Sequence, residues 1–286
     1  MNTLINGLCL GGIYALIALG YTMVYGIAKM LNFAHGDIIM AGGYTILVFM
    51  NTTGNVWLGL GAAVVFCVLL GILIEKVAYK PLRGASPLAI LITAIGVSYL
   101  LQSLAQILFE SNAKMVPLPS LGVWHLGGLE IQAYSVVTLA VTVVVMVVLS
   151  LFVKYTRTGR AMVAVSEDRG AAQLMGVNVN GIITITFAIG SALAALAGFF
   201  YLLKAPSIVP TFGSMPGIKA FTAAVIGGIG SIPGAMLGGI LLGVVECFCY
   251  ITPLAAYTDA IEFALLIVIL LVRPNGFLGK KRREKV

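Results

Sequence analysis

Long apolar runs separated by short polar gaps dominate the sequence. The five strongest runs cover residues 4–25, 56–74, 88–109, 134–153 and 182–203. Each holds close to the roughly 20 residues that a helix needs to cross a bilayer. A helix also satisfies its backbone hydrogen bonds internally, which a chain surrounded by lipid requires. The pattern therefore predicts five transmembrane helices.

Four weaker apolar runs lie among these helices. Residues 38–50, 220–232 and 260–272 are short for a simple crossing, and residues 234–252 are interrupted by Glu246. Short apolar segments are typical of half-helices and re-entrant pieces. We therefore expect an all-α polytopic membrane protein, one transmembrane domain over residues 1–286 with about eight to nine transmembrane or half-membrane helices, broken near the core.

The composition agrees with a membrane protein and excludes several functions. Of 286 residues, 60% are hydrophobic and 9% charged, whereas a soluble domain carries about a quarter charged residues. The gaps are too short for a soluble catalytic domain, so we expect no enzyme activity, no catalytic residues and no cofactor in this chain. Neither the two remote histidines, His35 and His125, nor the four cysteines, which lack C-x-x-C spacing, indicate a metal site.

Basic residues gather in a few gaps, which orients the predicted helices. Three lie in residues 76–83, four in 154–180 and six in the basic tail 273–286, with Lys29 in addition. Lys114, Lys204 and Lys219 remain for the other side. Cytoplasmic loops carry the excess of Lys and Arg, so we expect these gaps and the C-terminus in the cytoplasm and no nucleic-acid binding. The N-terminus is then outside if all nine segments cross, and inside if one is re-entrant.

The longest cytoplasmic gap, residues 155–180, is predicted to contain a helix that contacts a partner. Ser166 is suited to cap it, Glu167 and Asp168 suit the positive end of its dipole, and Gly176 suits its end. The alternative is a surface helix in the lipid headgroups. The expected apolar contact face consists of Ala171, Ala172, Leu174 and Met175.

Two further places carry polar groups within apolar sequence. Asp37 is placed to cap a helix that begins near Ile38, and a sharper interpretation puts Asn32, His35 and Asp37 at a broken-helix mouth that lines or gates a pathway. Glu246 lies well inside an apolar run and needs a partner, for which Lys219 is the candidate. Asp259 and Glu262 open the last helix, where they complement its dipole and receive no transport role.

The glycine-rich run 227–239 is expected to pack helices closely, with Pro233 breaking the chain into two helices. It lacks a following Lys-Ser or Lys-Thr, so it does not fit a nucleotide-binding loop.

Several short motifs resemble a known family. Ala171-Ala172-x-x-x-Gly176 has the spacing of the coupling loop of ATP-binding-cassette importer permeases, with Gly170 at the usual acidic position and no I-x-L-P tail. Other short motifs, spread over nearly the whole chain, resemble the branched-chain amino acid importer permeases, specifically the first of their two permease types. They are GIYALIALG at 12–20, NFAHGD at 32–37, GRAM at 159–162, GIKAFTAA at 217–224, GGIGSIPG at 227–234 and RPNG at 273–276.

The resemblance implies the permease subunit of an importer in the bacterial cytoplasmic (inner) membrane. It implies a second homologous permease, two cytoplasmic ATPase subunits that bind ATP and Mg, and an external substrate-binding protein as partners. The substrate it implies is leucine, isoleucine or valine, with urea or short amides as the alternative. An ion-coupled carrier is a weaker alternative, because only Glu246 stands out as a buried acid in the sequence.

Overall fold

The computed structural model describes residues 2–119, 122–126 and 129–279. The first three long helices are α1 (Asn2–Ala28), α2 (His35–Thr53) and α3 (Val56–Ile74), the last extended by a π-helical turn, Glu75–Tyr79, and a short 3₁₀ turn, Lys80–Leu82. The next are α4 (Pro87–Phe109), α5 (Ala133–Tyr155) and α8 (Val179–Lys204). The last are α9 (Ser214–Gly227), α10 (Ile232–Tyr250) and α11 (Thr258–Val272). The nine predicted apolar segments therefore all correspond to helices.

Two short helices and two small antiparallel ribbons complete the described chain. Helices α6 (Arg157–Glu167) and α7 (Arg169–Leu174) follow α5, and a 3₁₀ turn, Ala255–Tyr257, precedes α11. Strand β1 (Lys114–Met115) pairs with β4 (Ser207–Ile208), and β2 (Val123–Leu126) pairs with β3 (Leu129–Gln132). Seven of the described helices are long and apolar enough to span a membrane, and α2 and α9 are not among them.

Helix α1 is the centre of the fold. In the most apolar stretch of α1, 94% of the residues are buried. In the corresponding stretches of α4, α5 and α11 only 17% are buried, and these helices present apolar side chains outward. Helix α10 packs antiparallel on α1 through glycines: a Cβ on Gly243 would lie 2.1 Å from the backbone nitrogen of Gly11, and one on Gly239 would lie 2.5 Å from that of Ala15. The expected close packing of this glycine-rich run is observed.

Helices α2 and α9 begin inside the protein, with their first turns in contact. A Cβ on Gly36 would lie 2.4 Å from the carbonyl oxygen of Gly213, which directly precedes α9. The same turn of α2 meets α1 at Gly20, eight positions before the end of α1 and so about 12 Å from it. With 14 residues, α9 is about 21 Å long, short of the roughly 30 Å hydrocarbon core. The predicted breaks near the core are therefore present.

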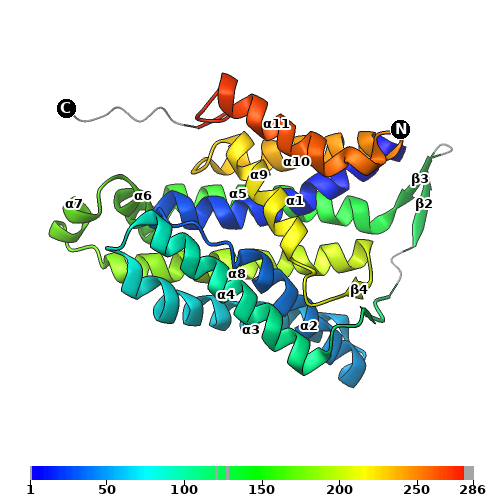
Figure 1. Cartoon of the computed structure of the whole chain (residues 1–286), viewed down its shortest axis with the longest axis horizontal. Coiled ribbons are helices and arrows are strands. Elements are labelled where there is room, and N and C mark those ends of the chain that lie inside the picture. The colour runs from blue at the N-terminus through cyan, green and yellow to red at the C-terminus, as the bar shows by residue number, and fades with distance from the viewer. Residues whose placement is uncertain (1, 120–121, 127–128, 280–286) are drawn as a thin grey trace.

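The chain places its polar connections at two opposite ends (Figure 1). Helices α6 and α7, the turn between α3 and α4, and the described part of the C-terminal segment lie at one end, and the N-terminus and the ribbon β2–β3 lie at the other. Phe277 N–H donates to the carbonyl of Ile226, which fixes the C-terminal segment against the end of α9. Residues 280–286 of the basic tail lie outside the described residues.

Three predicted boundaries were wrong. The segment predicted as 220–232 is helical from Ser214 to Gly227, so this helix starts six residues earlier and ends five residues earlier than predicted. The chain then turns through Gly228 and Gly230, whose φ angles are +102° and +94°, and Pro233 lies in the first turn of α10. Ser166 caps no helix start: it lies in the last turn of α6, where its Oγ donates to the carbonyl of Val163.

Candidate pathway and coupling surface

The first turns of α2 and α9 carry a polar cluster beneath α4. The Nε2 of Gln102, on α4, donates to the Asp37 carboxylate at 2.9 Å and to Ser214 Oγ at 3.2 Å. Asp37 is buried, and it forms no salt bridge among the described residues. The predicted cap is wrong: α2 already begins at His35, and no side chain caps it. Asp37 instead accepts from Gln102, and Gln102 connects α2, α4 and α9 at the point where α2 and α9 begin.

Asn32 and His35 lie close to this junction but use different partners. The hydroxyl of Tyr79, from the π-helical turn, donates to Asn32 Oδ1 at 2.9 Å. His35 is 1% exposed, and its ring packs on Tyr21 with centroids 4.6 Å apart. Within the described chain, His35 Nε2 and Asn32 Nδ2 are buried without a hydrogen-bond partner. The sequence motif thus forms a buried polar junction around the start of α2.

A second polar cluster surrounds Lys219 toward the opposite end of the bundle from α6 and α7. Lys219, which the sequence placed outside or near the outer half, is buried in α9 and contacts three carboxylates through Nζ. The distances are 3.1 Å to Glu246 on α10, and 2.9 Å to Asp259 and 3.2 Å to Glu262, both on α11. The oxygen of Glu246 that contacts Lys219, Oε2, also accepts from the Tyr14 hydroxyl of α1 at 2.7 Å.

The partner suggested for Glu246 is therefore present, but the cluster is larger than the sequence indicated. Asp259 does lie in the first turn of α11, yet it and Glu262 also neutralise Lys219, a role that dipole complementarity alone did not predict. Glu262 is fully buried. No spacing signal could have found this contact, because the partners lie on different helices far apart in sequence.

Sequence reasoning also missed Glu75, a third place where charge is buried. Its carboxylate accepts from Arg83 and, at 2.8 Å, from the Thr184 hydroxyl of α8. Asp37, Glu75 and Glu262 are buried in addition to Glu246, so the expectation of one buried acid was wrong. Glu75 lay at the edge of an apolar run beside Lys76, where it resembled part of a solvated loop.

The predicted contact face on residues 155–180 is only partly exposed. Leu174 and Met175 are 90% and 84% exposed, and Ala171 and Gly176 are exposed beside them. Ala172 is buried and packs α7 against the rest of the chain, so its place on the contact face is corrected. Gly176 has a φ of +82°, in the left-handed region that favours glycine. Glu167 and Asp168 are exposed, and Asp168 caps α7 by accepting from Ala171 N–H at 3.0 Å.

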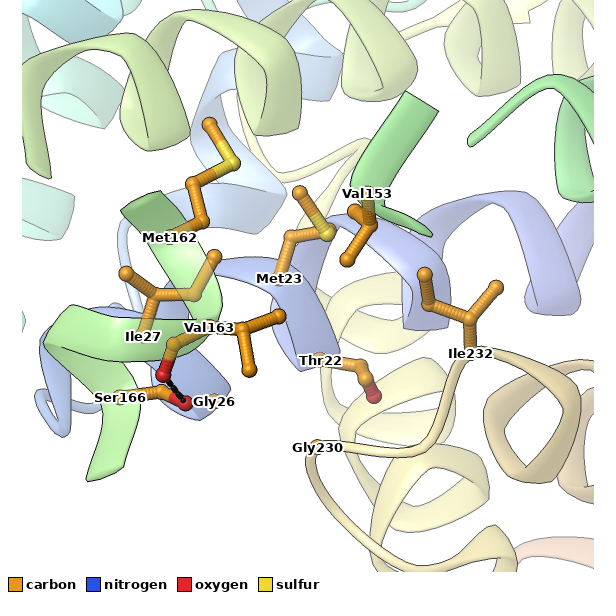
Figure 2. A pocket seen from close by; sticks show the side chains of 10 residues that line it. All are labelled: Thr22, Met23, Gly26, Ile27, Val153, Met162, Val163, Ser166, Gly230 and Ile232. Carbon is orange, nitrogen blue, oxygen red and sulfur yellow. Dashed lines mark hydrogen bonds between the residues drawn. The ribbon is translucent and has the colours of Figure 1, made fainter. Parts of the chain in front are cut away.

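Helices α6 and α7 also contact the core directly. A guanidinium N–H of Arg169, on α7, donates to the carbonyl of Ala28 at the end of α1. A small cavity of about 80 Å³ lies between α6 and α1, lined by Met162 and Val163 on one side and Met23 and Ile27 on the other (Figure 2). Thr22 borders it with a buried hydroxyl that has no partner in the described chain. The exposed loop is thus packed against the central helix.

Comparisons with known proteins agree with this architecture. The model of the family described as branched-chain amino acid transport system / permease component matches residues 3–270. The high-affinity branched-chain amino acid transport system permease protein BraD of Pseudomonas aeruginosa is 45% identical over 302 residues, covering 100% of this chain and 98% of that protein. The corresponding LivH protein of Escherichia coli K12 is 43% identical, covering 100% and 97%.

A solved structure shares the fold at low sequence similarity. PsaBC from Streptococcus pneumoniae, solved in complex with a Fab, matches with a TM-score of 0.50 and 14% identity, covering 99% of this chain and 92% of that one.

Proposed function

The chain belongs to the branched-chain amino acid transport system permease component family, and from this premise we propose that it carries leucine, isoleucine and valine into the cytoplasm. It is a multi-pass membrane protein and a transport permease, with no catalytic site of its own proposed. The observation that supports this choice of substrate is the full-length similarity to relatives that are named for branched-chain amino acid transport.

The energy for transport comes, in this proposal, from separate subunits. Two cytoplasmic ATPases bind ATP and Mg, and a second homologous permease completes the pathway. The assembly lies in the bacterial inner membrane, and an external binding protein delivers the substrate to it. The exposed apolar side chains of Leu174 and Met175 support an ATPase contact at α7, because exposed large apolar groups at the tip of a loop suit a partner's groove. Glu167, Asp168, Ala171 and Gly176 border this contact, and Ala172 supports it from beneath.

The orientation follows from charge. The end of the molecule that carries α6, α7 and the turn 76–83 also carries most of the described basic residues between helices, so it faces the cytoplasm together with the C-terminus. The N-terminus and the ribbon β2–β3 then face outward. Nine crossing segments satisfy this arrangement: α2 and α9 start within the membrane, and the chain that precedes each of them completes its crossing.

The substrate pathway passes the junction of α2 and α9. Non-helical backbone at membrane depth is tolerated where it is buried in protein or lines a cavity, and both helices begin from such backbone. Asp37, at the start of α2, offers a carboxylate with no basic partner among the described residues to the ammonium group of a passing amino acid. Asn32 and His35 shape the gate beside it, and the cluster of Lys219 and Glu246 holds α9 and α10 in place.

Co-purification and uptake test the proposal together. A tagged chain is extracted gently from its native membrane, its stoichiometric partners are identified by mass spectrometry, and the recovered complex is reconstituted with the binding protein for uptake of labelled leucine. Recovery of a second permease with two ATPases, and ATP-dependent uptake competed by isoleucine and valine, are the expected results. Competition by urea or acetamide, and not by isoleucine and valine, would replace the proposed substrate with urea or a short amide. Recovery of this chain alone would refute the importer assembly.

A further inference from the structure

An open cleft of about 290 Å³ lies beside α7, at the end of the molecule that carries the basic loops. Three parts of the chain form it: the turn after α3, helix α7 and the start of α8. Polar side chains supply most of its lining, with Ile183 at its base. The polar residues that border it are Arg83, Arg169, Gln173, Asn178 and Asn180.

Two guanidinium groups border the cleft and retain unused donors. Arg83 donates to Glu75 and to Asn180 Oδ1 through its two terminal nitrogens, while its Nε is buried with no acceptor in the described chain. Arg169 donates to Ala28 through one terminal nitrogen. Partial burial, and then the charge of Arg83, lower the pKa of Arg169 from its ordinary value. The two guanidinium groups lie close enough to repel each other, and an anion in the cleft would relieve this repulsion.

The start of α8 adds a further attraction for an anion. Asn178 caps this helix by accepting from Gly181 N–H at 3.0 Å. The N–H groups of Val179 and Asn180, in the first turn, have no acceptor within the helix because of helix geometry. At 26 residues α8 has a full dipole, whose positive end opens at the cleft. Free N–H groups, two arginines and a cleft of this volume therefore coincide.

We propose that this cleft binds a phosphate group. Arginine's planar fork matches phosphate oxygens in two-point contacts, which makes it the usual phosphate-binding side chain. The place of the cleft at the basic end of the membrane-embedded helices suits the headgroup of an anionic phospholipid such as phosphatidylglycerol. Free inorganic phosphate has the same chemistry and is the other source.

Binding to the intact purified protein tests this site without any measurement of transport. Delipidated protein is titrated with phosphatidylglycerol, with dioleoylglycerol as the lipid that lacks phosphate, and bound molecules are counted by native mass spectrometry. In a second titration, inorganic phosphate competes against phosphatidylglycerol. We expect one phosphatidylglycerol to bind in preference to dioleoylglycerol and to be displaced by phosphate. Binding of phosphate without a preference for phosphatidylglycerol identifies free phosphate as the ligand.

Three variants that each lower the net charge by one separate the cleft from bulk charge. Arg169→Gln removes a cleft guanidinium, and Gln173→Glu places a carboxylate on an exposed position of the cleft wall, where the fold tolerates it. Arg160→Gln, on the exposed side of α6 and away from the cleft lining, is the matched control.

The first two variants are expected to raise the dissociation constant about tenfold, the effect of one charge-assisted contact, and the control to leave it unchanged. Equal binding by all three variants and the wild type, or no binding of either phosphate-bearing probe, would overturn the proposal. Failure of the importer assembly would leave this result intact, because neither titration depends on transport.

Discussion

Replacing Lys219 by Gln is the sharpest test of the charge cluster. The ammonium group lies 2.9–3.2 Å from three carboxylates, and its side chain is 6% exposed. Glutamine keeps most of the side-chain length but removes the positive charge. Glu246 and Glu262, with side chains 5% and 0% exposed, would then be buried beside each other without a counter-ion.

The expected loss of stability is large for a single substitution. Breaking a buried ion pair by removing one partner typically costs about 3–5 kcal/mol, because the other charge stays buried and uncompensated. Asp259 contributes little to this loss, since its side chain is 53% exposed and can be hydrated. Lys114→Gln is the matched control: its pair with Glu110 spans 3.7 Å, the two side chains are 35% and 74% exposed, and its removal costs about 0.5 kcal/mol or less.

Thermal unfolding of the purified variants in one detergent measures the difference. Lys219→Gln should unfold far below the wild type, and Lys114→Gln close to it. Glu262→Gln should be much milder than Lys219→Gln, because three acids share one base and Glu246 and Asp259 still pair with Lys219 in that variant. A Lys219→Gln protein as stable as Lys114→Gln would refute the reasoning, and so would a Glu262→Gln protein as unstable as Lys219→Gln.

Three further outcomes follow from the described contacts. Leu174→Glu should reduce recovery of the ATPase in co-purification while membrane insertion stays normal, and Ala164→Glu, exposed on α6, is the control for an added charge. Gly243→Ala should lower thermal stability by about 1–3 kcal/mol, because the new methyl group meets α1, whereas Gly61→Ala, with open space around it, should not. Asp37→Asn should slow leucine uptake with little change in the amount of protein, and unchanged uptake would remove Asp37 from the proposed pathway.

The nine helices could be predicted from the sequence because lipid imposes a simple rule on apolar run length. The ends of α9 could not. The first half of α9 contains Lys219, which is buried because carboxylates of α10 and α11 contact it, and the predicted apolar run started directly after this lysine. Gly227 ends the helix earlier than hydropathy indicates, since the left-handed turn that follows is itself apolar.

The candidate sites were predictable only where the signal is local. The signals of Gly176 and Asp168 depend only on residues close in sequence. Gly176 has the left-handed conformation predicted for it, and Asp168 caps α7 instead of lying in the first turn of a helix that starts after Ser166. Gln102 gave no signal, because a neutral amide within a helix resembles any other polar residue until Asp37 is placed beside it. Glu75 and Glu262 were missed for the same reason: their burial depends on helices that join only in the folded chain.

Helix α1 connects the three places to which function is proposed. Tyr14 donates to Glu246 in the charge cluster, Gly20 packs against His35 at the start of α2, and the carbonyl of Ala28 accepts from Arg169 on α7. A buried helix moves more readily as a rigid body than by bending, because its internal hydrogen bonds have no alternative partners in an apolar surrounding. If a partner displaces α7 as proposed, we expect the displacement to reach the α2 junction through this one helix. The His35 ring is the side chain that lies between α1 and α2 there, since a Cβ on Gly20 would lie 2.5 Å from its Nε2, so we expect such a displacement to move this ring.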